Sequence, residues 1–413
     1  PSGLFSSERT TSDIGFTQEQ FRPDWDLQAT LSVLHLTQVA ERDSLLFPPG
    51  SNPGTGVFPD GLIGNPSYWE NQARADLATA YHGFEQHILR LGSGFFWGDI
   101  YKVHETKNFG PFLNPLPGGL TDVSDTPDAF LQEAQRTSGY LFLQDEWRLL
   151  EHTALTSGVR YDHYSDFGDT TNPRVALVHE WRPELSTRLS YGRAFHAPTF
   201  VDLYATNNPV GLGNPDLEPE VIDTWELSLH HQPRPDLGYN LTGFSYRIDD
   251  TITYVGVQAA NAGQRKGRGG ELEGTWQPQP ALRLVAHYSY QVATDIQTGT
   301  DVGEAPGEDA YIRLEWEFLP LWHWNTELLW VGKQLRVAGD LRPPLQDYTQ
   351  LNLTLSRQNL WRQLDLMLNL RNLADANVRE PSAGPSAPFP TPFIPEDYPQ
   401  AGRAATLEAS WHW

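Results

Sequence analysis

Apolar and polar residues alternate along much of the second half of the chain. In residues 311–318 (YIRLEWEF) the apolar side chains take every second position, and charged side chains fill most of the positions between them. The same alternation recurs in five further segments: 224–230, 281–291, 348–356, 363–371 and 403–413. A period of two over eight or more residues predicts β-strands that have one apolar face and one polar face.

The connections between the predicted strands alternate in length. Short turns, most of them with proline, are predicted near 182–185, 232–236, 277–280 and 319–322. Long polar or Gly/Pro-rich links are predicted near 196–220, 257–268, 293–308, 337–346 and 378–401, and strand-poor links at 41–70 and 104–136 extend the rhythm toward the N-terminus. Short turns at one edge and long loops at the other are typical of a transmembrane barrel. We expect the turns to face the periplasm and the loops the outside.

The predicted fold class is therefore all-β, a transmembrane antiparallel β-barrel that takes in the whole of 1–413. The pattern predicts about 17 strands, whereas a closed single-chain bacterial barrel needs an even number. The only methionine is Met367, so Pro1 is not a translation start. We expect the chain to be a barrel truncated on its N-terminal side, in which residues 1–23 form one partial strand.

A soluble β-protein is the alternative from another class. Turns recur about every 40 to 50 residues, which is close to the length of a propeller blade. A blade packs four short strands into that length, whereas here two long strands fill it. A soluble β-rich carbohydrate-binding protein stays open as the alternative reading.

Composition narrows the function classes. The net charge of -23 is spread along the chain and disfavours binding to nucleic acid. Disorder is disfavoured by the 14 Trp and 16 Tyr. No run of about 18 apolar residues exists, so we expect no transmembrane helix. The absence of cysteine removes disulfides and thiol chemistry.

No constellation of residues predicts catalysis, a metal site or a cofactor. The GRGG segment at 267–270 lacks the helix and the Lys-Ser/Thr that a phosphate-binding loop requires. Glu315 and Glu317 share one face of a strand, where we expect them to line a wet lumen. The sequence therefore predicts a protein that is not an enzyme.

Tryptophans gather near the predicted strand ends and turns. Amphipathic rings prefer the membrane–water boundary, so we predict that these residues mark it. They are Trp181, Trp276, Trp322, Trp324, Trp330 and Trp361, joined by Trp411 and Trp413 in the last segment. A final strand that ends on an aromatic residue is expected of outer-membrane barrels.

Several ordered stretches of the second half carry a family resemblance. They are 157–177, 189–209, 213–227, 368–381 and 398–413, with a Gly-x-Glu-x-Glu pattern at 269–273 inside 261–278. Together they resemble TonB-dependent outer-membrane receptors. The resemblance covers about 150–413, and the part before residue 150 matches only in rhythm.

This resemblance implies a location, an activity and partners. Such receptors have a barrel of about 22 strands, filled by an N-terminal plug, in the outer membrane. They take up scarce ligands such as ferric siderophores, cobalamin, haem or sugars, with energy relayed by the TonB complex. The chain contains no segment resembling the plug. We therefore expect TonB contact through the missing N-terminal part, and lipid and lipopolysaccharide around the barrel.

Five basic residues are candidates for ligand binding. Arg193 and His196 form a cationic pair at a predicted strand end near the barrel mouth, and Arg265, Lys266 and Arg268 cluster in the predicted loop 261–268. Such residues suit anionic chelates, so a ferric siderophore is the expected ligand, with cobalamin or another small nutrient as the alternative. Two other readings stay open, namely a salt bridge from Arg193 to an acidic neighbour and a basic loop that faces lipopolysaccharide. The Pro-rich stretch 378–399 is predicted to be a rigid external flap.

Overall fold

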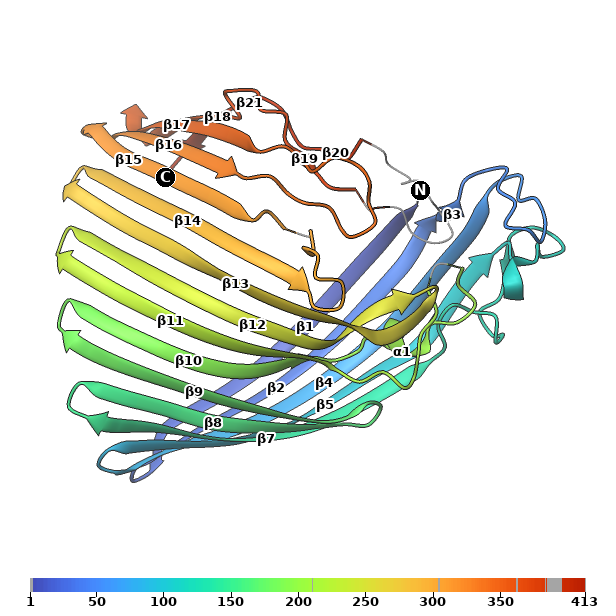
Figure 1. Cartoon of the computed structure of the whole chain (residues 1–413), viewed down its shortest axis with the longest axis horizontal. Helices are drawn as coiled ribbons and strands as arrows, with labels where there is room; N and C mark the ends of the chain where they lie inside the picture. Colours follow the sequence, from blue (N-terminus) through green and yellow to red (C-terminus); the bar gives the residue numbers. More distant parts are fainter. Residues whose placement is uncertain are drawn as a thin grey trace.

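The computed structural model describes residues 3–209, 211–303, 305–361, 363–382, 384 and 396–412. Figure 1 shows one strongly curved sheet, with the N-terminal strands (blue) forming the back and the middle and C-terminal strands (green to orange) curling round to the front. The prediction of an all-β chain is confirmed.

The long strands contain between 8 and 23 residues. They are β1 (Leu4–Arg22), β2 (Trp25–Arg42), β4 (Leu62–Phe84), β5 (His87–Lys107), β7 (Ala134–Leu150), β8 (Thr153–Tyr164), β9 (Gly168–Arg182), β10 (Leu185–His196), β11 (Glu220–Arg234), β12 (Leu237–Val255), β13 (Gln258–Gln279), β14 (Leu282–Asp295), β15 (Glu308–Leu319), β16 (Trp322–Val331), β17 (Tyr348–Trp361), β18 (Leu364–Arg371) and β21 (Ala404–Trp411). The short elements are β3 (Leu45–Phe47), η1 (Pro111–Leu113), β6 (Thr121–Asp122), α1 (Phe200–Tyr204), β19 (Arg379–Glu380) and β20 (Tyr398–Pro399).

Long strands that follow one another in sequence pair antiparallel throughout the sheet. The large sheet has 19 strands, and seventeen remain when the short strands β3 and β6 are left out, as the sequence predicts. Within the described ranges, β1 pairs only with β2, and β21 pairs only with β18. The first and the seventeenth strand of such a series run in the same direction, so β1 and β21 cannot form an antiparallel ladder with each other.

Two-residue hairpin turns lie along one edge of the sheet, which we call the turn edge. All four predicted turns are confirmed there, since β9–β10, β11–β12, β13–β14 and β15–β16 are joined in this way. In each of these turns the first of the two linking residues is proline, whose fixed φ suits a turn and whose missing N–H is not needed by a ladder. The opposite edge carries the longer connections, together with the two-residue link between β12 and β13, and is called the loop edge (Figure 1).

The prediction of a long link over 257–268 is wrong. β12 ends at Val255 and β13 begins at Gln258, so only Gly256 and Val257 lie between them. Gly256 has a φ of 67°, which a tight hairpin requires and glycine adopts without strain. Residues 258–268 lack the apolar alternation because this part of β13 extends past the apolar part of the sheet. A polar strand of this kind carries no period-two signal.

Residues 1–23 and 41–70 also contain more strand than predicted. β1 is a full strand of 19 residues rather than a partial one. β4 begins at Leu62, inside the predicted link. The predicted flap 378–399 lies mostly outside the described residues, which here are 378–382, 384 and 396–399.

The two faces of the sheet differ in chemistry. Residues in direct register share a face, and such pairs join exposed leucines across neighbouring strands, as in Leu189–Leu227 and Leu241–Leu272. We call this the apolar face. Glu226, Glu271 and Glu273 occupy the intervening positions and so belong to the opposite, polar face. None of the segments that the structure describes covers the apolar face, whose leucines are exposed, and this face therefore suits contact with lipid.

Most buried apolar side chains gather at the loop edge, in the loops and in the strand ends that meet them. One cluster joins Phe47, Phe58, Leu62 and Phe109, and a second joins Leu203, Leu217 and Ala259. Loops that are far apart in sequence are tied together there, for example where the Thr206 amide donates to the Phe130 carbonyl at 2.8 Å. The loop edge is therefore a folded structure that can hold a shaped site.

Candidate ligand-binding site

A cavity of about 720 Å³ lies at the loop edge, over β12 to β17. It forms where two strands separate. The β14–β15 ladder ends at the pair Tyr290–Glu308, whereas the β13–β14 ladder continues to Arg265–Asp295. The upper part of β14 therefore lacks a strand neighbour on one side. Residues 296–303 fold back along it, with the Val302 amide donating to the Ala293 carbonyl at 3.0 Å.

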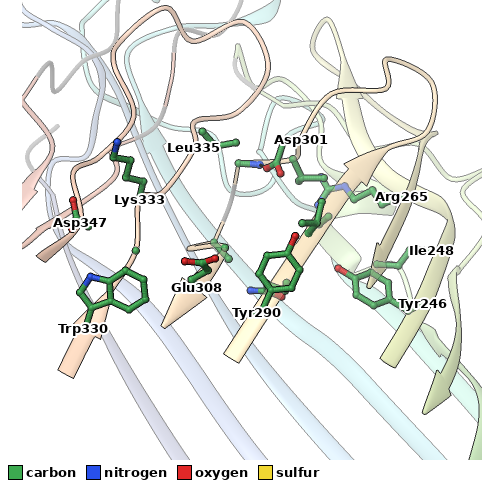
Figure 2. Close-up of a pocket in the computed structure, with 18 residues that line it drawn as sticks. Tyr246, Ile248, Arg265, Tyr290, Asp301, Glu308, Trp330, Lys333, Leu335 and Asp347 are labelled. Carbon is green, nitrogen blue, oxygen red and sulfur yellow. Dashed lines mark hydrogen bonds between the residues drawn. The ribbon is translucent and has the colours of Figure 1, made fainter. Parts of the chain in front are cut away.

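Aromatic and charged side chains line this cavity. Figure 2 shows the rings of Tyr246, Tyr290 and Trp330 spread along its lower side, with Arg265 and Lys333 above them at opposite ends. The lining residues come from both faces of the sheet, because the cavity lies where the wall opens between β14 and β15. Rings of this kind offer surfaces for stacking, and the cations offer charge-assisted hydrogen bonds.

Carboxylates share the cavity with these cations. The cavity is also lined by Asp301, Glu308 and Asp347. Figure 2 shows these carboxylates together with Arg265 and Lys333. The site is thus mixed in charge. A ligand in this cavity meets both hydrogen-bond donors and hydrogen-bond acceptors, and an apolar surface from Ile248 and Leu335 in addition.

The far wall of the cavity is fixed by a glycine and a buried ion-pair network. Gly303 has a φ of 71°, and a Cβ at this position would lie 2.1 Å from the Arg336 carbonyl oxygen. The Arg336 guanidinium in turn binds Asp397 (Nη2 to Oδ2, 2.6 Å), and both side chains are largely buried. This hydrogen bond from Arg336 holds the pKa of the Asp397 carboxyl at about 2, below its usual range. The network joins the loop after β16 to the segment before β20 and so holds this wall in place.

The five basic residues singled out in the sequence do not come together. Arg265 lines the cavity. Because residues 258–268 form a strand, Lys266 and Arg268 point to the opposite face from Arg265 and are exposed. Arg193 forms an ion pair with Asp223 (Nη2 to Oδ2, 2.8 Å), and His196 lies 3.3 Å from Glu220 (Nδ1 to Oε2). Only one of the five residues therefore belongs to the cavity.

Sequence reasoning missed the other lining residues for a physical reason. Tyr290 and Trp330 occupy the apolar positions of alternating strands, so the sequence pattern assigns them to a continuous apolar face. Lys333 follows Trp330 closely, which is a signal for a charged strand end but not for a cavity. Their common site depends on where the β14–β15 ladder stops, and no local pattern encodes that point.

Most of the predicted interface tryptophans lie at the turn edge. Trp181 and Trp276 lie in β9 and β13 close to their turns, Trp322 begins β16 and Trp361 ends β17. Trp324 follows in β16, and Trp411 in β21 lies against Trp361 with ring centroids 6.2 Å apart. Trp330 instead lines the cavity, and Trp413 lies outside the described residues.

No group of three or more His, Cys, Asp or Glu side chains that could hold a metal ion is found within the described ranges. No helix in the part of the chain that the structure describes has the length and apolarity needed to cross a membrane.

The architecture defines a class of protein. An antiparallel sheet with an uncovered apolar face, short turns at one edge and folded loops at the other is the wall of a transmembrane β-barrel. Residues 2–373 match the β-barrel family described as TonB dependent receptor-like, and the chain belongs to that family. It is an outer-membrane protein, and its family consists of receptors and transporters rather than enzymes.

Curated relatives match one part of the chain. The vitamin B12 transporter BtuB of Vibrio cholerae is 30% identical over 122 residues, which are 30% of this chain and 19% of that protein. The iron-regulated outer membrane virulence protein of Vibrio cholerae is 34% identical over 123 residues, which are 29% of this chain and 19% of that protein.

Solved structures match nearly the whole chain in fold. The ferric enterobactin receptor PfeA of Pseudomonas aeruginosa superposes with a TM-score of 0.74 at 18% identity, covering 98% of this chain and 61% of the receptor. The copper transporter OprC gives a TM-score of 0.76 at 16% identity, covering 98% of this chain and 65% of that protein. The chain thus spans less than two thirds of these proteins.

Proposed function

We propose that the protein takes up a ferric siderophore across the outer membrane and that the loop-edge cavity binds this ligand. The observation that carries the proposal is the placement of Arg265 and Lys333 on either side of three aromatic rings. Siderophore chelates are commonly anionic and often aromatic, so paired cations and stacking surfaces suit them. Membership of a receptor family supports uptake driven through the TonB complex.

A cobalamin is the second candidate ligand. Three carboxylates line the cavity, and carboxylates accept hydrogen bonds from amide groups, of which a corrin carries several. The relative named a vitamin B12 transporter adds support from sequence. Copper is less favoured, because the chain has no Cys and a single Met, and soft sulfur ligands are those that Cu(I) prefers.

The soluble carbohydrate-binding alternative does not hold, because the chain belongs to an outer-membrane barrel family. The choice of ligand within that family is what an experiment must decide.

Ligand titration of the whole protein tests the proposal. Trp330 lines the cavity, so quenching of tryptophan fluorescence by ferric enterobactin reports binding. Changing Arg265→Ala and Lys333→Ala together should weaken binding by ~10-fold or more, since each charge-assisted hydrogen bond contributes about 1.5 kcal/mol or more. The matched control is Lys266→Ala with Arg268→Ala, which removes two cations from the opposite face.

Each outcome of this titration has a clear meaning. Equal affinity of the cavity variant and the unaltered protein would overturn the cavity as the siderophore site. Saturable binding of cyanocobalamin, with none of ferric enterobactin or of a ferric hydroxamate, would replace the siderophore by the second candidate.

A further inference from the structure

A row of charged residues crosses the apolar face at its loop-edge border. Four residues on the adjacent strands β10 to β13 lie in direct register, namely Arg193, Asp223, Arg247 and Lys266. Side chains in direct register stand on the same face, so the row is continuous across the four strands. Arg193, Arg247 and Lys266 are exposed.

The row belongs to the face that carries the leucines. Two positions nearer the turn edge, the register row contains Tyr191, Trp225 and Ser245, with Arg268 at its end. Two positions further, the next row begins with Leu189 and Leu227. Trp225 is 55% exposed and Leu227 is 57% exposed, so the rings and the aliphatic side chains share one open surface. Along β10 and β11 the order is therefore apolar, then aromatic, then charged, and Arg247 of β12 and Lys266 of β13 lie in the same register row as the charged residues of these two strands.

This order gives the depth of the charged row. A lipid-facing wall passes from hydrocarbon through an aromatic girdle to the headgroup layer. The cations beyond the aromatic row therefore lie at headgroup level on the loop-edge side, which is the outer leaflet when the turns face the periplasm.

Arg268 of the adjacent row joins the three cations of the charged row to make a patch of four cations, and two of these four are already paired. The Arg193 guanidinium binds Asp223, which also accepts a hydrogen bond from the Tyr191 hydroxyl at 2.6 Å. Arg247 binds Asp249 (Nη2 to Oδ1, 2.8 Å). Four cations face two carboxylates, so the patch carries a surplus of two positive charges in a chain whose net charge is -23.

Lys266 and Arg268 supply that surplus. Among the residues that the structure describes, neither has an ion-pair partner in the protein. They alternate with Gly267 along β13 and so project side by side from the same face. Lys266 at headgroup level and Arg268 next to it, in the aromatic row at the border of that level, are together complementary to phosphate, which Arg binds through paired N–H groups and Lys as a point charge.

We infer that Lys266 and Arg268, flanked by Arg247 and Trp225, bind the phosphate groups of a phosphorylated glycolipid of the outer leaflet. The phosphate takes hydrogen bonds from the Lys266 ammonium and the Arg268 guanidinium. The Trp225 ring lies against the apolar part of the same lipid. This site stands on the opposite face from Arg265 and does not depend on the identity of the transported ligand.

Lipid retention by the whole protein tests the site. The protein is extracted from outer membranes in mild detergent, and the lipopolysaccharide that stays bound is quantified by mass spectrometry of the intact complex. Lys266→Gln with Arg268→Gln should lower the bound glycolipid by ~10-fold, because two charge-assisted contacts are lost. The matched control is Arg265→Gln, which removes a cation from the neighbouring residue on the other face and should retain the lipid.

A charge-keeping variant and a thermal unfolding measurement separate loss of the cations from loss of the fold. The charge-keeping change Lys266→Arg with Arg268→Lys should retain the glycolipid, and heat-modifiable migration on a gel checks that every variant is folded. In vesicles of phosphatidylcholine, added lipopolysaccharide should raise the unfolding temperature of the unaltered protein more than that of the Gln variant.

Three results would overturn the glycolipid site, and a fourth would assign its cations to another ligand. Equal glycolipid on the Gln variant and the unaltered protein would overturn the site, as would equal loss from the Arg265→Gln control. Displacement of the lipid by inorganic phosphate at the same concentration would show recognition of free phosphate and would also overturn it. Loss of ferric-siderophore binding in the Gln variant, with glycolipid retained, would assign these cations to the transported ligand instead.

Discussion

Placing an arginine on the apolar face of β13 should destabilise the folded protein strongly, whereas the same change one residue away should not. Leu272 is 46% exposed and lies in register with Leu241 and Tyr288 on neighbouring strands. Glu271 precedes it and points to the polar face. The two substitutions Leu272→Arg and Glu271→Arg thus introduce the same side chain on the two faces at nearly the same height.

The depth of Leu272 in the membrane determines how much Leu272→Arg lowers the free energy of unfolding. Trp276 lies four residues nearer the turn edge on the same face, which corresponds to ~10 Å along the membrane normal for a strand that rises ~3.4 Å per residue and tilts by ~40°. An apolar band ~25 Å tall then has Leu272 close to its middle. Arginine at that depth costs ~2–4 kcal/mol, which lowers the ratio of folded to unfolded protein by ~30-fold to ~900-fold.

Urea titration of the whole protein in lipid vesicles measures this loss, with heat-modifiable migration as the readout of folded barrel. Leu272→Arg should lower the free energy of unfolding by the amount above, and Glu271→Arg should change it by less than ~1 kcal/mol. Equal losses for the two variants, or a larger loss for Glu271→Arg, would refute the assignment of the leucine face to lipid.

Three further predictions follow from the same structure. The chain has no cysteine, so a single cysteine at position 271 should react rapidly with a membrane-impermeant maleimide while one at position 272 stays protected until denaturation; equal reaction rates would contradict the alternation of faces. Arg336 lowers the pKa of the Asp397 carboxyl from 3.8 to about 2, so the ionised carboxylate stabilises the folded loops by about 2 kcal/mol above pH ~4. This contribution to stability is lost as the pH falls toward 2. Asp397→Asn should abolish that pH dependence, measured by protease cleavage of the loops between pH ~4 and ~2, and an unchanged profile would count against the network. Arg136 pairs with the buried Asp166 carboxylate (Nε to Oδ2, 2.6 Å) and donates from Nη2 to the Pro198 carbonyl at 2.8 Å, so Arg136→Ala should cost ~3–5 kcal/mol and speed proteolysis of the loop at 197–209; unaltered cleavage would show that Arg136 does not hold this loop.

The strands were predictable from sequence wherever one face is apolar and the other is polar. Residues 311–318 show this alternation, and β15 (Glu308–Leu319) extends it by only a few residues. The turns were equally clear because proline at their first position leaves few other conformations. The count of about 17 strands followed from these two signals together.

Strands beyond the membrane could not be recognised in the same way. In β13 the residues before Arg268 are polar, glycine or alanine on both faces, so no period-two signal exists and the sequence predicts a loop for this segment. A loop would allow Arg265, Lys266 and Arg268 to form one cationic cluster, as the sequence predicts. A strand separates them, since neighbours in a strand point to opposite faces.

The cavity depended on long-range information. Tyr290 and Trp330 are ordinary members of an alternating pattern, and only the end of the β14–β15 ladder turns them into lining residues. The folded segment 296–303, with Gly303 at the wall of the cavity, completes the site, and loop packing of this kind is not encoded in a local period.

Uptake by cells tests the central claim most directly. A strain that lacks the gene is compared with the same strain carrying the whole protein, under iron limitation, with radiolabelled ferric enterobactin and ferric hydroxamate supplied separately from labelled cyanocobalamin. The account predicts that uptake of a ferric siderophore is lost on deletion and restored by the whole protein, but not by the variant with Arg265→Ala and Lys333→Ala. Unchanged siderophore uptake after deletion, together with a loss of cyanocobalamin uptake, would contradict it.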